Sequence, residues 1–293
     1  MAPLLGASSA ALFEMWRSDG PVETGTGHGV SWARQGGVLF AVVEVPEAVA
    51  LRGADETTLQ AAGRVAYEKV FALAASQGIP HLWRVWNFLA DINRETDGLE
   101  RYRQFNQGRQ HAFMAAGRAV RGAVPAASAL GLAGGPVSVA FLAGFQPLLA
   151  IENPRQISAY DYPPEYGPAS PTFSRAGLVR LDRQAVLFIS GTASIVGHAT
   201  LHTGDAARQC HESLDNIEAL LARAAEISPD AGFGLSELTY RVYVRHPGDY
   251  AQVCDVLRSR VGAVAPAIFL QADVCRSELL LEVEAVGFRE ARP

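Results

Sequence analysis

The chain contains the same order of predicted elements twice, and this internal repeat limits its possible folds more than any other feature. In the second half, strands and helices are predicted in alternation at residues 183–195, 204–225, 238–247, 249–261 and 278–288. The first half shows the same order at residues 36–45, 55–78, 81–92, 101–117 and 136–144. Each half is therefore predicted to be one β-α-β-α-β unit of about 140 residues.

The helix predicted at residues 204–225 has the clearest periodicity. Its apolar residues recur at helical spacing, which is typical of a helix that covers one face of a sheet; they are Ala207, Cys210, Leu214, Ile217, Leu221 and Ala224. Either Thr203 or Asp205 can cap its N-terminus, and Gly78 is expected to close the corresponding helix of the first half.

The predicted fold class is α+β (α/β), with two mixed sheets that each carry helices on one face. Such a sheet must also bury its second face, and the natural partner is the sheet or edge of another copy, which explains why one chain contains two. We therefore expect two β-α-β-α-β units packed side by side in one chain. The division is placed between residues 1–150 and residues 151–293.

Three stretches lack the periodicity of regular elements. Residues 152–176 are rich in proline and tyrosine and are interpreted as an ordered loop that links the halves. Residues 119–135 are rich in alanine and glycine and are interpreted as a surface loop. The sequence GTGHG at 25–29 is followed by a predicted strand, which favours a hairpin or loop over a dinucleotide-binding turn.

Composition excludes several classes of protein. The chain is 49% hydrophobic and 19% charged, with a net charge of −5, which indicates a globular protein and gives no reason to expect nucleic acid or a membrane as a partner. No apolar run approaches the roughly 20 residues that span a bilayer, and the N-terminus lacks the pattern of a signal peptide. Three cysteines without CxxC pairing favour a reducing, cytoplasmic location. The histidines at 198, 202 and 211 lack the spacing of metal ligands, so no metal is expected.

Two acidic residues interrupt the apolar last strand, LLLEVEAV. Glu282 and Glu284 are two positions apart, so strand alternation points both to the same face. Burial raises the pKa of a carboxyl group and makes it a usable general acid near neutral pH. A solvated face of an edge strand, with the two glutamates in a cross-strand ladder, remains the alternative on this pattern alone.

Residues 190–224, 238–257 and 279–286 closely resemble the three signature blocks of the reactive-intermediate deaminase (imine and enamine hydrolase) family. The resemblance implies a chorismate-mutase-like fold of the Bacillus type, with Glu282 at the position of the catalytic glutamate. Proteins of that family are trimers with sites at the seams between copies. Ala267 stands where the family carries a carboxylate-binding arginine, which speaks against simple imine hydrolysis.

A second resemblance covers nearly the whole chain. The sequences RYRQFNQGR (101–109), ENPRQISAYDYPPEYGP (152–168), SGTAS (190–194) and QADVCRSELLLEVEA (271–285) are similar to the motif set of the chorismatases. This resemblance implies an enzyme, without metal or cofactor, that releases pyruvate from chorismate. The second product in that family is a dihydroxycyclohexadienoate, 3-hydroxybenzoate or 4-hydroxybenzoate, and the active site lies in the C-terminal half near the seam.

The resemblance implies that Glu282 protonates the enol-pyruvyl ether of chorismate. Arginines that bind its two carboxylates and tyrosines that line the ring complete the expected site. The residues expected to bind substrate are Arg155, Tyr162, Gly191, Thr192, Arg109, Tyr160 and Arg245.

Two positions bear on the product. Gly191 and Cys275 resemble the 3-hydroxybenzoate-forming subtype, and a thiol beside the ring can relay a proton during aromatisation. We therefore expect 3-hydroxybenzoate, with hydrolysis to the diene-diol or formation of 4-hydroxybenzoate as alternatives. An imine hydrolase and a non-catalytic small-molecule-binding protein of the same fold also remain open. The oligomeric state is left open between a monomer and a homo-oligomer, and a trimer is suggested only by analogy.

Overall fold

The computed structural model describes residues 3–6, 15–16, 20–27, 29–50, 52–229 and 232–290. The prediction that the N-terminus is not a signal peptide falls largely on residues outside these ranges. Position 28 of the glycine-rich stretch also lies outside them. Among the described residues, no helix combines the length and the apolar character needed to cross a bilayer.

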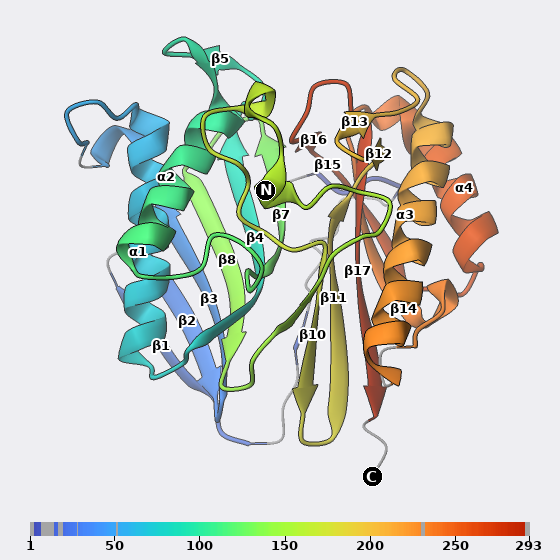
Figure 1. The fold of residues 1–293 in the computed structure, drawn as a ribbon, viewed down its shortest axis with the longest axis horizontal. Helices are drawn as coiled ribbons and strands as arrows, with labels where there is room; N and C mark the ends of the chain where they lie inside the picture. Colours follow the sequence, from blue (N-terminus) through green and yellow to red (C-terminus); the bar gives the residue numbers. More distant parts are fainter. Residues whose placement is uncertain are drawn as a thin grey trace.

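Two β-sheets make up the centre of the molecule, one from each half of the chain (Figure 1). The first sheet has seven strands in the order β1 (Glu23–Gly27), β2 (Val30–Gln35), β3 (Val38–Val45), β8 (Val137–Gly144), β4 (His81–Ala90), β7 (Ala126–Leu132) and β16 (Asp273–Val274). The second has six, in the order β15 (Ala267–Gln271), β14 (Leu238–Val244), β17 (Leu281–Glu290), β11 (Gln184–Thr192), β10 (Ala176–Leu181) and β9 (Leu149–Ile151).

The internal repeat predicted from the sequence is present in the topology. The strand order β2-β3-β8-β4-β7 of the first sheet matches β10-β11-β17-β14-β15 of the second. In each sheet, the two strands that are connected through the second helix of that half run parallel to each other. These pairs are β4 with β7 and β14 with β15. Each half thus contains the predicted β-α-β-α-β core with additional strands.

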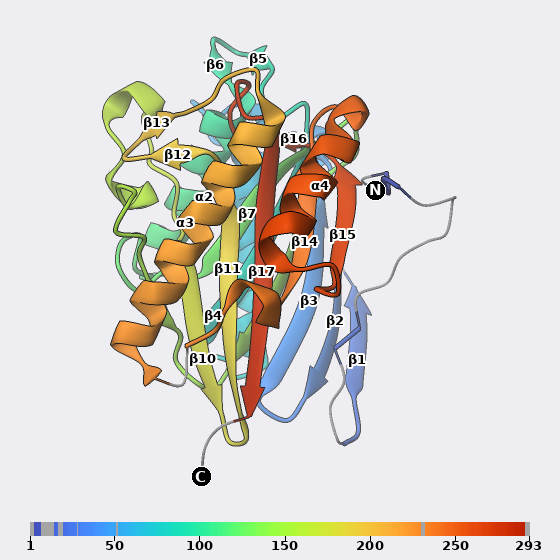
Figure 2. The same ribbon diagram turned by 90° about the vertical axis from the view of Figure 1, so that its right-hand side faces the viewer.

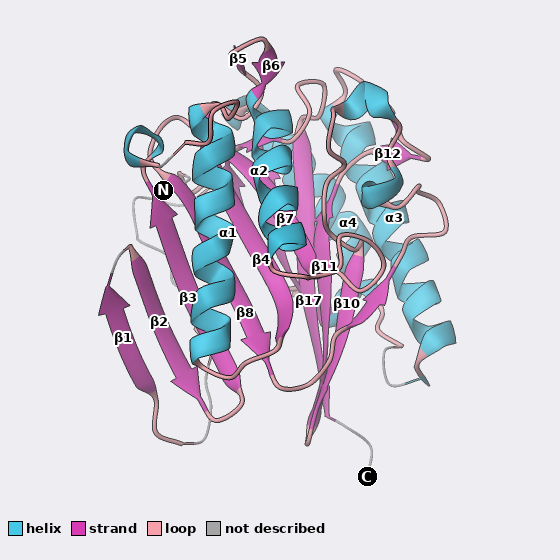
Figure 3. Cartoon of the chain, turned by 60° about the vertical axis from the view of Figure 1, so that its left-hand side comes forward, coloured by secondary structure: helices cyan, strands magenta, loops and turns pink. Residues whose placement is uncertain are grey.

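Four helices cover the outer faces of the two sheets. They are α1 (Thr58–Ser76), α2 (Arg101–Ala115), α3 (Ala206–Ile227) and α4 (Tyr250–Val261). Figure 3 shows α1 and α2 in front of the first sheet, and Figure 2 shows α3 and α4 in front of the second. The side chain of Asp205 accepts a hydrogen bond from the backbone N–H of Arg208, which settles the predicted cap of α3. Gly78 closes α1 with a φ of 64°.

The inner faces of the two sheets pack against each other, as expected. Trp83, Trp86 and Leu142 of the first sheet form one buried cluster with Val186 and Phe188 of the second. This apolar seam buries the faces that the helices leave uncovered, and it holds the halves together through the hydrophobic effect.

The expectation for residues 119–135 was wrong. They contain β7, a buried strand that pairs with β4 and with the short strand β16. Most of its residues are small, and none is one of the β-branched or aromatic residues by which strands are recognised. They are small because β7 runs through the seam, where the other sheet and a cavity approach it closely.

Other strands also went unpredicted, including β2, β10 and β15. β10 begins at the last residue of the stretch interpreted as a linking loop. β9 straddles residues 150 and 151 and pairs with the second sheet. The division of the chain at that point therefore stays an interpretation. In the glycine-rich stretch, Gly25 and Gly27 belong to β1, which forms a hairpin with β2.

Candidate active site

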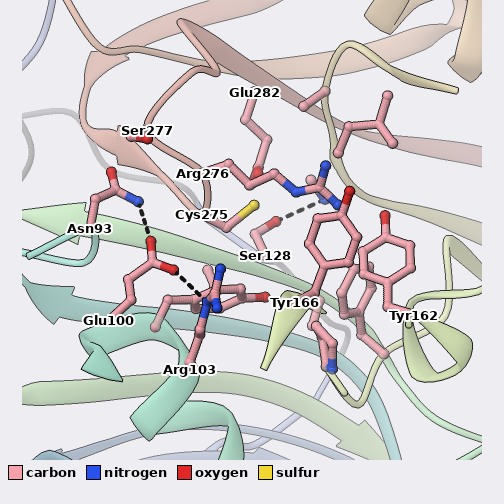
Figure 4. A pocket seen from close by; sticks show the side chains of 18 of the residues that line it. Asn93, Glu100, Arg103, Ser128, Tyr162, Tyr166, Cys275, Arg276, Ser277 and Glu282 are labelled. Atoms are coloured by element: carbon pink, nitrogen blue, oxygen red, sulfur yellow. Dashed lines mark hydrogen bonds and ion pairs between the residues drawn. The ribbon is translucent and has the colours of Figure 1, made fainter. Parts of the chain in front are cut away.

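A cavity of about 400 Å³ lies at one end of the seam between the halves. Its wall includes residues of α2, β7 and the segment that joins β5 (Glu95–Thr96) to β6 (Leu99–Glu100) in the first half. The second half contributes the linking loop, the end of β11, the start of β17 and residues 275–278. This volume suits a small molecule. Figure 4 shows the side chains that converge on it.

Glu282 lies on the wall of this cavity and is 3% exposed. Its Oε1 atom is buried without a hydrogen-bond partner. Burial raises the pKa of Glu282 to about 8, the charge of Glu284 adds to the rise, and Arg84 and Arg175 oppose it. Glu282 therefore carries a proton at neutral pH and can donate it into the cavity.

Gly191 makes room for this carboxyl group. A Cβ atom at position 191 would lie 1.9 Å from Oε1 of Glu282, so any side chain here would displace it. The strand register shifts between Ile189 and Thr192, and this irregularity places Gly191 against Glu282. The N–H of Gly191 donates a hydrogen bond of 3.0 Å to Oγ of Ser128 on β7.

Three arginines line the cavity without an ion pair to a carboxylate among the described residues: Arg109, Arg175 and Arg276. Each has a buried nitrogen without a hydrogen-bond partner, namely Nε of Arg109, Nε of Arg175 and Nη2 of Arg276. A buried guanidinium group is costly to leave unpaired. The cavity is therefore suited to an anion.

Arg109 and Arg175 are the most deeply buried of the three, at 1% and 5% exposure. Arg109 projects from α2 and donates a hydrogen bond of 2.7 Å to Oδ1 of Asn106. Arg175 precedes β10 and donates to the hydroxyl of Tyr162 at 2.8 Å. Glu152 lies nearby, but burial raises the pKa of its carboxyl group, which weakens it as a counter-ion for Arg175.

Arg276 lies across two tyrosines of the linking loop. Its guanidinium carbon is 4.2 Å from the ring centroid of Tyr166 and 5.2 Å from that of Tyr162. Nη1 donates to the carbonyl oxygen of His198 at 2.8 Å, which leaves Nη2 for a ligand. The rings and the guanidinium plane together form one wall of the cavity (Figure 4).

Cys275 follows β16 and faces the same space (Figure 4). Burial raises the pKa of its thiol to about 12, and the charge of Glu282 adds to this rise. The group is therefore a neutral thiol at physiological pH. It can donate and accept a proton but is a poor nucleophile.

The structure does not place Arg155, the arginine most favoured from the sequence, on the cavity wall. Its guanidinium group forms an ion pair with Glu212 at 2.6 Å and a hydrogen bond with Asn216 at 2.7 Å, both on α3. Arg155 therefore anchors the linking loop to that helix.

Arg245 is also a structural residue. It pairs with Asp273 at 2.6 Å and donates to the backbone oxygens of Val274, Arg276 and Leu279. These bonds hold the segment that carries Cys275 and Arg276. Arg245 thus supports the cavity from behind.

The last two expected contacts, Thr192 and Tyr160, lie off the wall as well. The hydroxyl of Thr192 is turned back to the carbonyl oxygen of Ser190 at 2.8 Å. The side chain of Tyr160 interacts with the carboxyl group of Glu152 and opposes the rise of its pKa. Of the expected residues, Glu282, Cys275, Gly191, Tyr162 and Arg109 line the cavity.

The chain is similar to known proteins over most of its length. Residues 14–143 match the family model described as "Chorismatase FkbO/Hyg5-like, N-terminal". A 3-hydroxybenzoate synthase of Streptomyces hygroscopicus is 37% identical, over 93% of this chain and 80% of that protein. A chorismatase of Streptomyces rapamycinicus is also 37% identical, over 93% of this chain and 81% of that protein.

The chain belongs to the chorismatase family.

A solved structure confirms the shared fold. The crystal structure of a chorismatase superimposes with a TM-score of 0.83 at 36% identity, and the match covers 91% of this chain and 80% of that one. Among the described residues of this chorismatase-family chain, no group of three or more His, Cys, Asp or Glu side chains is arranged to hold a metal ion.

Several wall residues were not selected from the sequence of this family member, including Arg175, Arg276, Ser128 and Arg103. Arg276 stands next to Cys275 inside a recognised motif, so the sequence offered a signal for it. Arg175 precedes an unpredicted strand, and Ser128 lies in a strand taken for a loop. Neither had a usable signal.

Proposed function

We propose that this protein releases pyruvate from chorismate and forms 3-hydroxybenzoate. The family membership supports the reaction class, and relatives of 37% identity carry the names chorismatase and 3-hydroxybenzoate synthase. The observation that carries the proposal is the pairing of one protonated, buried carboxyl group with three arginines that lack carboxylate partners among the described residues, around one cavity. Because Cys210, Cys254 and Cys275 are free thiols, we place the reaction in the reducing cytoplasm.

The arginines are proposed to bind the two carboxylates of chorismate. Arg109 and Arg175 are buried, and a charge-assisted hydrogen bond from each is strong because water is excluded. Arg276 adds a third guanidinium group on the tyrosine wall. A dianion satisfies the orphaned donors and offsets their desolvation, which explains how unpaired cations are tolerated here.

Glu282 is proposed to start the reaction as a general acid. It transfers its proton to the terminal methylene carbon of the enol-pyruvyl ether, and the ether carbon gains the character of an oxocarbenium ion. The oxygen of the C4 hydroxyl group then attacks ring carbon C3 and gives up its proton, while the bond between C3 and the ether oxygen breaks. Pyruvate leaves, and a 3,4-epoxide remains on the ring. General acid catalysis of this kind contributes on the order of 10²- to 10⁴-fold to the rate.

The proposed product agrees with the atom balance. Pyruvate and 3-hydroxybenzoate together contain all the atoms of chorismate, so the conversion needs no oxidant and no second substrate. Aromatisation breaks the bond between the epoxide oxygen and C4 and removes the ring proton at C3, and the oxygen that stays on C3 takes up a proton to become the hydroxyl of 3-hydroxybenzoate. We propose that the neutral thiol of Cys275 relays the ring proton to the conjugate base of Glu282, its neighbour in the cavity.

The test is a coupled assay in which lactate dehydrogenase reports pyruvate, followed by chromatography of the aromatic product. Purified protein should release one pyruvate for each chorismate consumed and yield 3-hydroxybenzoate. Folded protein that leaves chorismate unchanged would show that the proposed reaction is wrong. A diene-diol or 4-hydroxybenzoate in place of 3-hydroxybenzoate would correct only the product.

Replacing Gly191 with alanine tests the fit of the proton donor. The new Cβ atom would force the carboxyl of Glu282 to move, whereas the fold should survive because that carboxyl is the flexible end of a side chain. A displacement of about 1 Å in an active site costs on the order of 10²-fold in rate. We expect 3-hydroxybenzoate formation in Gly191→Ala to fall by about 10- to 100-fold, measured by chromatography. An unchanged rate would mean that Glu282 does not act from its observed position.

A further inference from the structure

Two glutamates on the same face of β17 have opposite surroundings. Glu282 and Glu284 are both buried, at 3% and 5% exposure. Glu282 leaves Oε1 without a hydrogen-bond partner, whereas Glu284 is surrounded by donors from both halves. Two neighbouring buried carboxylates repel each other, so the two groups differ in protonation: one keeps its proton and the other is ionised.

The partners of Glu284 come from β4 and β7 on one side and β14 on the other. Arg84 forms an ion pair with Oε2, and Arg241 forms one with Oε1 at 2.7 Å. The hydroxyl of Ser128 donates at 2.8 Å and the indole N–H of Trp86 at 2.9 Å. Burial by itself raises the pKa of Glu284, but Arg84 and Arg241 hold it below its ordinary value. Glu284 is thus an ionised residue.

Arg84 also lies within electrostatic reach of the proton donor. Ser128 accepts a hydrogen bond from Arg84, and it accepts another from the N–H of Gly191. Gly191 in turn contacts the carboxyl of Glu282. Arg84 lowers the pKa of Glu282, which is the expected effect of a nearby cation. If Arg84 lost its present partner, Glu282 would be the nearest remaining carboxylate on that face.

We propose that Glu284 is a positioning residue that binds Arg84 across the seam and thereby keeps this arginine from forming an ion pair with Glu282. This inference rests on the proposed role of Glu282 as the proton donor. An ion pair with Arg84 would convert Glu282 to a carboxylate, which cannot donate a proton to the enol ether. The second glutamate of the strand thus preserves the acid form of the first.

Other groups also influence the pKa of Glu282, and the interpretation of a pH profile has to include them. The titratable and charged side chains that face it from the surrounding elements are Glu284 of β17, Arg84 of β4, Arg175 before β10, Cys275 after β16 and Tyr102 of α2. Burial raises the pKa of Cys275 to about 12 and raises that of Tyr102, so both stay neutral near pH 8. Only Glu282 is expected to titrate.

The experiment measures the pH profile of kcat/KM, because its limbs report groups of the free enzyme. In the parent protein the profile should fall above about pH 8, where Glu282 loses its proton. Glu284→Gln removes a charge that raises the pKa of Glu282 and also frees Arg84, so the alkaline limb should move down by about 1 to 3 pH units. At about pH 8 this lowers kcat/KM by about 5- to 500-fold. The double variant Glu284→Gln/Arg84→Gln removes the freed cation as well, and its limb should return toward that of the parent.

If Glu284 acted on Glu282 only through its own charge, Arg84→Gln would raise the limb by the same amount in the parent and in Glu284→Gln, whereas the proposal predicts a larger rise in Glu284→Gln. If Glu284→Gln does not fold, Arg84→Gln alone still decides the matter, since Arg241 continues to pair with Glu284. This variant should move the limb to higher pH, and an unmoved limb would overturn the proposal. Glu56→Gln is the matched control. Glu56 does not line the cavity and forms an ion pair of 2.7 Å with Arg64, so its substitution should leave the alkaline limb in place.

Failure of the proposed function is recognised separately. If Glu282→Gln retains activity, Glu282 is not the proton donor and the foundation of this inference is wrong. If Glu282→Gln is inactive while the limb of Glu284→Gln coincides with that of the parent, only the inference about Glu284 is wrong. A ¹³C NMR titration of labelled glutamate carboxyls, with Glu282→Gln for assignment, gives a readout that is independent of turnover.

Discussion

Glu282→Gln should lower kcat for pyruvate release by about 10²- to 10⁴-fold, which is the usual contribution of a general acid. Glutamine has nearly the same shape as a protonated glutamic acid, so it fits beside Gly191, but its amide cannot transfer a proton to carbon. KM should change little because the arginines that bind the carboxylates are untouched. The coupled pyruvate assay measures both constants.

The same substitution should stabilise the protein at alkaline pH. Glu282 ionises near its ordinary pKa of 4.5 in the unfolded chain but only near 8 in the folded protein. Its contribution to stability is therefore fully present below about pH 4.5 and is lost as the pH rises to about 8. Glutamine has no charge to bury, so Glu282→Gln should have the higher Tm at about pH 8.5.

The control for this prediction is Glu290→Gln, at the exposed end of the same strand. It should change neither kcat nor the pH dependence of Tm. A variant of Glu282 that keeps most of its kcat, with the control unchanged, would contradict the assignment of the proton donor. A lower Tm for Glu282→Gln at about pH 8.5 would instead show that the folded protein stabilises the charged form of Glu282.

Arg175→Gln should reduce kcat/KM by roughly 10- to 100-fold, mainly through KM. A hydrogen bond between charged groups is worth about 1.5–3 kcal/mol, and each 1.4 kcal/mol corresponds to about ten-fold. Arg175 has a buried nitrogen aimed at no protein partner, so its loss removes a substrate contact. Steady-state kinetics with chorismate, and circular dichroism to check the fold, measure the effect.

Arg155→Gln is the matched control, because the two arginines flank the same linking loop. Arg155 is engaged by Glu212 and Asn216, so its substitution should lower Tm and leave kcat/KM unchanged. If Arg155→Gln raised KM as much as Arg175→Gln, the sequence-based assignment of Arg155 would be right and the cavity wall described above would be wrong. The comparison therefore separates an arginine that binds ligand from one that anchors a loop.

Strand alternation depends on neighbours along the chain, so the sequence was sufficient to place both glutamates on one face, and the family resemblance selected Glu282 as the expected proton donor. Glu282 and Glu284 had to share a face, but the pattern alone left open whether that face is buried or solvated. Which of the two keeps its proton could not be predicted from that pattern. That depends on Arg84 and Ser128, which are far away in the sequence and meet Glu284 only across the seam.

The arginines were harder to predict for the same reason. Arg155 lies in a recognisable motif, but its ion pair with Glu212 forms only when the loop docks on α3. Arg175 has no periodic context, and its importance arises from burial beside a cavity. The strand β7 was missed because small residues, which its crowded position requires, imitate the composition of a loop.

The seam has a consequence for how such a molecule can evolve. In an assembly of identical subunits, every copy must carry both the acid and the groups that bind the anion. Here Arg109 comes from one half and Glu282 from the other, while β16 of the second half joins the sheet of the first. Since a single chain encodes both halves, mutations can specialise one for holding the substrate and the other for proton transfer. The two repeated units of one chain can therefore carry different functional residues, which identical subunits cannot.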